Sequence, residues 1–191
     1  MTLQRCPWCL GDTKNQHYHD NEWGNPNIDE NSLFEFLVLE TFQTGLSWKI
    51  IINKRESIKK SFSNFNIEKI AEYDIIQINN LLKNKNIIRN KLKIESTISN
   101  AKAFIKIQKK EESFSNYIWK FVNGIPIQNN FKNQKEIPKQ TKLSMIISKD
   151  LKQRGFKFVG PIVTYSFMQA IGLVNDHLTS CFRHKELLKK N

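Results

Sequence analysis

The stretch Leu151-Lys-Gln-Arg-Gly-Phe-Lys-Phe-Val-Gly-Pro-Ile-Val-Thr-Tyr165 decides the fold. It predicts two helices joined by a turn, because the first ends at Arg154-Gly155 and Pro161 suits the first turn of the second. Between Gly155 and Gly160, such a turn exposes backbone N–H groups beside a positive helix N-terminus, which is a seat for phosphate. The segment also fits an ordinary αα-hairpin with a glycine C-cap, and the stretch alone leaves both interpretations open.

The rest of the chain also reads as helices joined by short polar loops. Asn31 or Ser32 is expected to cap the helix at 29–44, and Asn66, Asp74 and Thr141 are expected to begin later helices. Residues 123–140 are expected to form a surface loop. Alternating strand patterns with tight turns are absent from the sequence. We therefore predict an all-α fold in a single domain over residues 1–191. The other helices are expected at 29–44, 47–53, 67–73, 74–83 and 89–110, from Ser113, and from Thr141 to Arg154.

The charge is large and unevenly distributed. The 191 residues carry 30 Lys plus Arg and 18 Asp plus Glu, a net charge of +12. Residues 1–48 have a net charge of −5, residues 49–110 of +10 and residues 111–191 of +7. Since 25 of the basic residues are Lys, as in AT-rich genomes, the total alone is a weak sign of a polyanion partner. The change of sign indicates one part that grips a polyanion and another that handles a cation or metal, although chance clustering remains an alternative.

Thiols and imidazoles gather near both ends of the sequence, which suggests a metal site. His177 and Cys181 are four residues apart, so we expect them on one helical face. With one N-terminal Cys and one His they would form a tetrahedral Cys2His2 zinc site. The spacing leaves open whether Cys6 pairs with Cys9 or with His19, and it also fits a metal-free arrangement with buried thiols and exposed histidines. The full set is Cys6, Cys9, His17, His19, His177, Cys181 and His184.

An acidic and aromatic cluster lies within the first 48 residues. Glu40 stands between Leu39 and Phe42 in a predicted helix whose apolar face should be buried, and a buried carboxylate needs a partner. Near Trp48 and Tyr18 it would suit a planar cation, because rings stack on such a ligand while the carboxylate supplies the countercharge. A salt-bridged glutamate among core tryptophans is the simpler alternative.

These blocks occur together and in this order in one known family. The chain resembles the bacterial DNA-3-methyladenine glycosylase I family, which removes 3-methyladenine from DNA, from about residue 5 to residue 181. The matching blocks are Arg5-Cys6-x-Trp8, Tyr18-His19-Asp20-Asn21-Glu22-Trp23-Gly24, Gly45-Leu46-Ser47-Trp48, Arg154-Gly-Phe-Lys-Phe-Val-Gly160, Tyr165-Ser-Phe-Met-Gln-Ala170 and Gly172-Leu-Val-Asn-Asp-His177, with Cys181.

The resemblance implies a helix-hairpin-helix DNA glycosylase with a structural zinc ion joining segments 1–24 and 172–185. It assigns Glu40 as the catalytic residue, which holds the base together with four aromatic residues. The zinc ligands it implies are Cys6, His19, His177 and Cys181. The base-binding residues are Glu40, Trp48, Tyr18, Trp8 and Trp23. The DNA-binding residues are Gly45 and Leu46, expected in the gap left by the flipped base, and Gly155, Phe156, Lys157, Phe158, Val159 and Gly160 of the hairpin (about 151–165).

The implied reaction is hydrolysis of the N-glycosidic bond of 3-methyladenine in alkylated double-stranded DNA, with free 3-methyladenine as the product. Asn175 stands where many relatives carry a catalytic Asp, so no Asp-assisted step is expected. No motif positions a Lys nucleophile, so lyase activity is not expected either. A zinc-stapled DNA-binding protein without catalysis is the alternative. We further expect a cytoplasmic monomer without a membrane segment.

Four departures from the usual family pattern bear on the pocket. Asn15 replaces a tyrosine, which removes one possible stacking partner. Thr41, Phe42 and Thr44 are bulkier than the usual residues, so we expect a reshaped pocket floor or DNA-facing loop.

Overall fold

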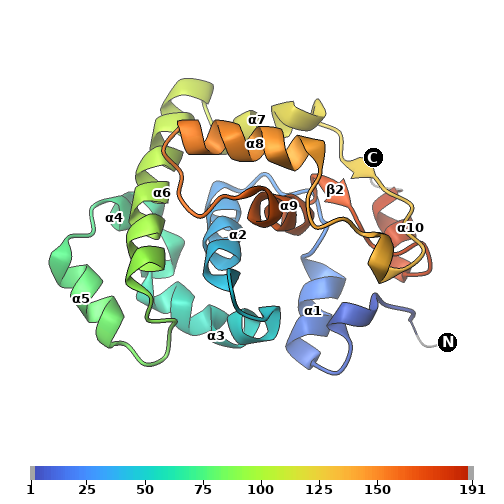
Figure 1. Ribbon diagram of the computed structural model, residues 1–191, viewed down its shortest axis with the longest axis horizontal. Helices are drawn as coiled ribbons and strands as arrows, with labels where there is room; N and C mark the ends of the chain where they lie inside the picture. Colours follow the sequence, from blue (N-terminus) through green and yellow to red (C-terminus); the bar gives the residue numbers. More distant parts are fainter. Residues whose placement is uncertain (1–2, 189–191) are drawn as a thin grey trace.

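The computed structural model describes residues 3–188, and within them the chain is almost entirely helical (Figure 1). Figure 1 shows α2 near the centre, with α4, α5 and α6 toward one end of the molecule and α1 and α10 toward the other. The α-helices are α1 Thr13–Asn21, α2 Glu30–Gln43, α3 Trp48–Ser61, α4 Ile67–Ala71, α5 Ile75–Lys83, α6 Lys91–Glu111, α7 Phe114–Trp119, α8 Lys142–Gln153, α9 Pro161–Ala170 and α10 Phe182–Leu188. Four short 3₁₀ helices accompany them: η1 Pro7–Cys9, η2 Ser63–Phe65, η3 Lys120–Val122 and η4 Gln134–Glu136.

One strand pair departs from the all-α prediction. β1 (Ile127–Gln128) pairs in parallel with β2 (Val174–Asn175), Ile127 opposite Val174. Two residues are too short to produce an alternating pattern, so the sequence gives no sign of these strands. Apart from β1 and η4, the predicted loop at 123–140 is irregular.

Most of the predicted helix starts are confirmed, and two helix bounds differ from the prediction. Asp29 rather than Asn31 or Ser32 caps α2, with its carboxylate accepting a hydrogen bond from Ser32 N at 2.8 Å. An aspartate one position before the first turn does this better than a residue already inside it. α3 runs on to Ser61 instead of ending near Asn53. The predicted caps that accept a hydrogen bond from their own helix are Asn66, Asp74, Ser113 and Thr141.

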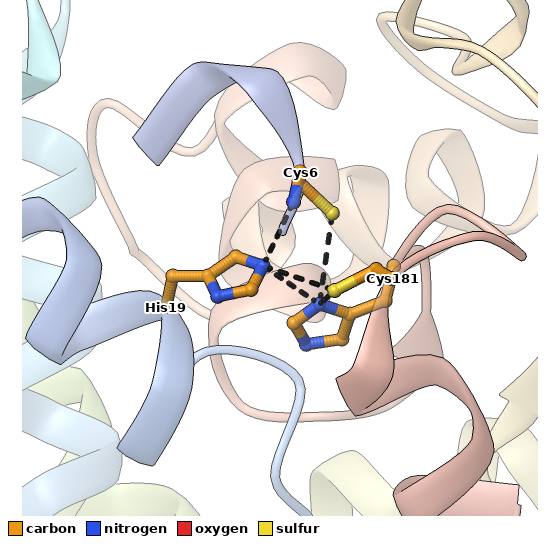
Figure 2. A group of neighbouring side chains, drawn as sticks. Cys6, His19 and Cys181 are labelled. Atoms are coloured by element: carbon orange, nitrogen blue, oxygen red, sulfur yellow. Dashed lines mark hydrogen bonds between the residues drawn. The ribbon is translucent and has the colours of Figure 1, made fainter. Parts of the chain in front are cut away.

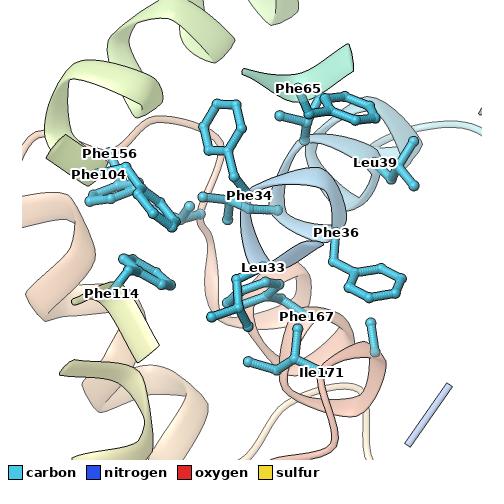
Figure 3. Packing of buried hydrophobic residues seen from close by; sticks show 14 of the residues in the cluster. Leu33, Phe34, Phe36, Leu39, Phe65, Phe104, Phe114, Phe156, Phe167 and Ile171 are labelled. Atoms are coloured by element: carbon cyan, nitrogen blue, oxygen red, sulfur yellow. The ribbon is translucent and has the colours of Figure 1, made fainter. Parts of the chain in front are cut away.

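α2 is the central helix of the core. Every residue from Leu33 to Phe42 is buried, so this helix is covered on all sides rather than along one stripe. Aromatic rings from α6, α7, α9 and the hairpin turn pack around it (Figure 3). Phe104 and Phe114 stack at 4.1 Å between ring centroids. Glu40 is therefore carried into the interior by a helix whose other side chains hold the fold together.

The predicted hairpin joins α8 to α9 through a turn that is fixed from α6. Lys157 N donates to Asn100 Oδ1 at 2.7 Å, and Asn100 Nδ2 donates back to Lys157 O at 3.1 Å. Ser148 Oγ of α8 donates to Val159 O at 2.6 Å. Gly155 has φ +95°, a left-handed conformation that favours glycine. The turn is thus pre-shaped rather than loose.

The N-terminal segment lies against α9 and the segment that follows it. Gly24 N donates to Gln169 O at 3.0 Å, and Phe182 N donates to Gln4 O at 3.0 Å. A Cβ at Gly172, where φ is +76°, would come within 2.4 Å of the Asn25 backbone. This close approach requires glycine and brings the start of the chain to the same place as its C-terminal part.

Candidate active site

All five predicted base-binding residues line one cavity of about 220 Å³. We call it the aromatic cavity. It lies where the N-terminal segment, α2, α3 and α9 meet. Its lining residues are Trp8, Tyr18, Trp23, Glu40, Gln43, Trp48, Gln134, Ile137, Ser166 and Gln169.

The walls of the aromatic cavity are rings supplied by three elements. Trp8 lies in η1, Tyr18 in α1, and Trp48 begins α3. The Tyr18 and Trp48 rings lie 4.9 Å apart between centroids at 40°, and Trp8 meets Trp23 edge-on at 5.1 Å. Flat aromatic faces of this kind suit a planar ligand.

Glu40 places a carboxyl group in this apolar surrounding. Its residue is 5% exposed, and none of the hydrogen bonds within residues 3–188 involves its carboxylate. Burial raises the pKa of Glu40 from 4.5 to about 8. A cation entering the aromatic cavity would supply the partner that this side chain lacks.

Two other polar atoms of the lining residues are buried without a partner in the described part of the chain. They are the Tyr18 hydroxyl and Trp48 Nε1. Burial, helped by the charge of Glu40, raises the pKa of Tyr18 well above its usual value, so the phenol keeps its proton. The aromatic cavity therefore combines one acceptor carboxylate with two unused hydrogen-bond donors.

Sequence reasoning did not select Gln43, Gln134, Ile137, Ser166 or Gln169. Helical spacing could have found three of them: Gln43 follows Glu40 by three residues, as Gln169 follows Ser166. Gln134 and Ile137 come from the irregular 123–140 stretch, where no period indicates which side chains turn inward.

The four predicted metal ligands come together at the other side of Trp8. The ligand atoms of Cys6, His19, His177 and Cys181 all lie within 4.8 Å of one another, and all four residues are buried (Figure 2). His177 Nδ1 lies 3.2 Å from His19 Nε2 and 3.7 Å from Cys6 Sγ, and Cys181 Sγ lies 3.4 Å from His19 Nε2. Ligand atoms of a tetrahedral zinc site are about 3.3–3.8 Å apart. The donor set therefore fits zinc in type, and the distances just given lie close to the spacing of such a site.

Outer contacts fix which nitrogen each imidazole presents to this cluster. His19 Nδ1 pairs with Asp20 Oδ1 at 2.8 Å, and Asp20 is held by Arg5. His177 Nε2 donates to Trp23 O at 3.0 Å. The opposite nitrogens, His19 Nε2 and His177 Nδ1, are thus free to bind a metal.

The expectation that His177 and Cys181 share a helical face is wrong. Residues 176–181 form a turn that precedes α10, and the turn rather than a helix brings the two side chains together. Cys9, His17 and His184 stay outside the cluster. Cys9 Sγ donates to Cys6 O, His17 contacts Asn21, and His184 Nε2 contacts Asn129 O.

A second hollow, which we call the hairpin groove, adjoins the aromatic cavity and shares three of its residues. It has a volume of about 470 Å³ and runs from the loop after α2 to the start of α9. Leu46 is 36% exposed at its edge, and Gly45 has φ +79°. Its lining residues are Glu40, Gln43, Thr44, Gly45, Leu46, Gln140, Gly160, Pro161, Ile162, Val163 and Ser166.

The predicted DNA-binding residues of the hairpin divide into two kinds. Phe156 and Val159 are buried in the core, so their side chains cannot touch a ligand. Lys157 is exposed and Phe158 half-buried, and the chain at Phe158 has φ +55°. Contact with a polyanion at Phe156 and Val159 is therefore left to the backbone.

The departures from the family pattern lie mostly outside the aromatic cavity. Thr41 and Phe42 are fully buried in the core, and Thr44 lines the hairpin groove. Asn15 is buried with its Oδ1 unpaired within residues 3–188, but it does not line the aromatic cavity.

Comparison with known proteins finds relatives that match nearly the whole chain. The chain is 43% identical to a DNA-3-methyladenine glycosylase of Haemophilus influenzae, over 93% of this chain and 96% of that one. It superposes on a crystal structure of a 3-methyladenine DNA glycosylase I with a TM-score of 0.91 at 45% identity, covering 94% of this chain and 98% of the other. A Staphylococcus aureus structure that addresses 3-methyladenine recognition gives a TM-score of 0.91 at 35% identity, over 95% and 97%. These similarities place the protein among the glycosylases.

The particular family follows from the family model. The methyladenine glycosylase model matches residues 8–184, which is nearly all of the chain. The chain belongs to the methyladenine glycosylase family.

Proposed function

We propose that this protein excises 3-methyladenine from alkylated double-stranded DNA by hydrolysing its N-glycosidic bond, as one glycosylase domain and without lyase activity. The observation that carries the proposal is Glu40, a buried carboxylate without a partner inside the aromatic cavity. A related glycosylase I with a TM-score of 0.90 at 35% identity, over 93% of this chain and 96% of that one, was solved in complex with 3-methyladenine.

The proposed selectivity comes from charge. 3-Methyladenine in DNA is cationic, whereas adenine is neutral, so ionised Glu40 stabilises the damaged base and leaves the normal one without a charge partner. Tyr18 and Trp48 supply faces for stacking. The base must leave the duplex to reach a cavity of this kind, and alkylated bases pair and stack less well.

The cationic base is itself a good leaving group. When the C1′–N9 bond breaks, its electron pair stays on the base, which becomes neutral 3-methyladenine. A water oxygen bonds to C1′ and its proton passes to solvent. Glu40 then faces a neutral product and no longer has the charge pairing that held the substrate, which favours release of the base.

An Asp-assisted step and a lyase step would each need a residue that does not line the aromatic cavity. Asn175 is buried and donates to Gln128 Oε1 and His184 O, and Asp176 is held by neighbouring side chains, so neither lines the aromatic cavity. None of the residues lining the aromatic cavity is a lysine, and the ammonium of buried Lys93 donates to two carbonyl groups at the end of α2, those of Phe42 and Thr44. These contacts support a hydrolytic step without an Asp base and without a Schiff base.

The DNA would be held along the hairpin groove. A helix-hairpin-helix role for α8 and α9 is supported by the fixed turn before Pro161 and by exposed Lys157, which together suit a backbone phosphate. Leu46 stands at the edge of the hairpin groove beside Gly45 and is proposed to fill the space left by the flipped base.

Zinc is proposed as the structural metal of the Cys6, His19, His177 and Cys181 cluster. The bound ion would supply the positive charge that allows two buried thiolates to lie together. The proposal extends to a monomer acting in the cytoplasm; no helix within residues 3–188 is long and apolar enough to cross a bilayer.

Release of bases from methylated DNA tests the proposed function. The wild-type protein is expected to release 3-methyladenine, identified by chromatography, and Glu40→Gln is expected to lower this release at least tenfold while the protein stays folded. A wild-type protein that binds methylated DNA but releases no base would instead support the DNA-binding alternative without catalysis.

A further inference from the structure

Gln169 of α9 lines the aromatic cavity, and its amide is held at one end. Gln169 Nε2 donates to Asp176 Oδ2 at 2.8 Å. The nitrogen is therefore committed to the carboxylate. The carbonyl oxygen Oε1 accepts none of the hydrogen bonds found within residues 3–188, so it is the free polar atom of this cavity-lining side chain.

Asp176 is itself held by two other side chains, so the surrounding structure fixes the orientation of the Gln169 amide. Asp176 is fully buried and accepts from Tyr165 OH at 2.6 Å and from Asn129 Nδ2 at 2.7 Å. Reversing the Gln169 amide would point its carbonyl oxygen at the Asp176 carboxylate and leave an acceptor facing an acceptor. Such a reversal is unfavourable in a buried site.

The chemistry of purine bases gives this orientation a meaning. Adenine carries an amino group at C6, which donates hydrogen bonds, whereas guanine and hypoxanthine carry a carbonyl oxygen there, which only accepts. A fixed acceptor on a side chain that lines the aromatic cavity would accommodate the amino group and repel the carbonyl. The charge of Glu40 alone distinguishes a cationic base from a neutral one. It cannot separate 3-methyladenine from 3-methylguanine, because both are cations in DNA.

We infer that Gln169, oriented by Asp176, is a specificity-determining residue that selects a base with an amino group at C6 over one with a carbonyl group. The inference rests on the proposed function and adds to it the discrimination between 3-methyladenine and 3-methylguanine. Asp176 is a positioning residue in this arrangement, acting through Gln169.

The test compares the two bases released from the same methylated DNA. Gln169→Met keeps the size of the side chain but removes the acceptor, so the ratio of 3-methyladenine to 3-methylguanine released per lesion should fall about tenfold. Gln43→Met is the matched control, because Gln43 also lines the aromatic cavity but none of the hydrogen bonds in the described region orients its amide. Gln43→Met is expected to change both releases together and to leave the ratio as in the wild type.

A second readout uses the free bases and does not depend on turnover. Trp8, Trp23 and Trp48 line the aromatic cavity, so their fluorescence should report binding of 3-methyladenine and of 3-methylhypoxanthine. The Kd for 3-methylhypoxanthine divided by the Kd for 3-methyladenine should fall about tenfold in Gln169→Met. If that variant does not fold, Gln169→Leu provides the same measurement.

The outcomes separate the inference from the proposed function. A ratio that is the same in a folded Gln169 variant and in the wild type would overturn the inference even when the wild type releases 3-methyladenine. An equal loss of both bases would overturn it too, because it indicates a purely structural role. A wild type that releases no base at all rejects the proposed function itself.

Discussion

At the scale of single residues, the burial of Glu40 is unfavourable for folding but provides the charge that a cationic base requires. Its carboxyl group is buried in α2 without a partner, and burial raises its pKa to about 8. Ionising it in the empty protein costs roughly 5 kcal/mol relative to water. A cationic base offsets part of this cost because it supplies the opposite charge, and a neutral base does not. The cost of ionising Glu40 therefore favours binding of the cationic base.

This conflict predicts how activity depends on pH. Since ionised Glu40 is the form that binds the cation, kcat/KM for base release should rise about tenfold per pH unit below pH 8 and level off above it. Tyr18, the titratable residue that faces Glu40 from α1, keeps its proton throughout this range. Glu40→Gln should show a low and flat profile between pH 6 and 9, and a wild-type profile that is equally flat would remove Glu40 from the mechanism.

The same group should make folding stability depend on pH in the opposite direction. The folded protein holds a proton on Glu40 that the unfolded chain releases above pH 4.5, so stability falls as pH rises from 4.5 to about 8. Glu40→Gln cannot ionise, and its free energy of unfolding should exceed that of the wild type at pH 8.5 but not at pH 5. Urea unfolding at both pH values measures this difference, and an advantage of equal size at both would contradict the assignment.

At the scale of elements, the end of α2 is fixed by a buried lysine from α6. Lys93 is 5% exposed, and its Nζ donates to Phe42 O at 2.8 Å and to Thr44 O at 2.6 Å. These carbonyls belong to the last turn of α2 and the residue after it, where no helical N–H is available. Lys93 therefore sets the direction in which the chain leaves α2 toward Gly45 and Leu46.

Lys93→Met should disconnect that loop from α6. It leaves two carbonyls without a donor, so we expect a loss of about 2 kcal/mol in the free energy of unfolding. Binding to methylated DNA should weaken more than binding of free 3-methyladenine, because the loop lines the hairpin groove and the base lies in the aromatic cavity. Lys91→Met, at an exposed position of the same helix, is the control for both measurements. Equal weakening of both ligands would contradict this role of Lys93.

The elements also show how much the sequence could predict. Caps and helix-ending residues are local signals, which is why the starts at Asn66, Asp74, Ser113 and Thr141 are right. The path of the chain through His177 and Cys181 was not predictable from spacing, because the same four-residue interval fits a helix and a turn. In the first turn of α6 the buried position is taken by Lys93, while apolar Leu92 is exposed, so hydrophobicity alone would assign this turn the wrong inward face.

The candidate site also contains residues that the sequence could predict and residues that it could not. The family resemblance named five residues that line the aromatic cavity and four cysteine and histidine residues that the structure brings together. Gln134 and Ile137 could not be foreseen, because they reach the aromatic cavity from an irregular stretch whose position depends on tertiary contacts. The hydrogen bond between Gln169 and Asp176 likewise depends on how the chain after α9 turns back along that helix.

At the scale of the whole molecule, the cluster of cysteine and histidine residues and the aromatic cavity are built from the same segments of the chain. Cys6 is two residues before Trp8, His19 follows Tyr18, and the second nitrogen of His177 donates to the backbone of Trp23. The staple between the two ends of the fold thus also holds three walls of the aromatic cavity. Losing the proposed zinc ion should loosen the proposed base site, although no residue of the cluster lines the aromatic cavity.

Cys181→Ser tests this connection. The variant should hold well under one zinc ion per chain, unfold at a lower temperature and lose most of its tryptophan fluorescence response to free 3-methyladenine. Cys9→Ser is the matched control, since Cys9 is a buried thiol that stays outside the cluster. Full zinc content in Cys181→Ser would contradict the proposed ligand set. An intact fluorescence response in zinc-free protein would show that base binding does not depend on the zinc site.

The distance along the chain between the ligands has a consequence for synthesis. Cys6 and His19 are made early, whereas His177 and Cys181 follow more than 150 residues later. At ~5–20 residues per second, the first thiol waits roughly 9–35 seconds for its last partner. During that interval α2 and its neighbours can already collapse and pack against Tyr18, but the segment with Trp8 and Trp23 still lacks its contacts with Gln169 and His177. A nascent chain would therefore gain its core first, and its ability to recognise a damaged base only once His177 and Cys181 have been made.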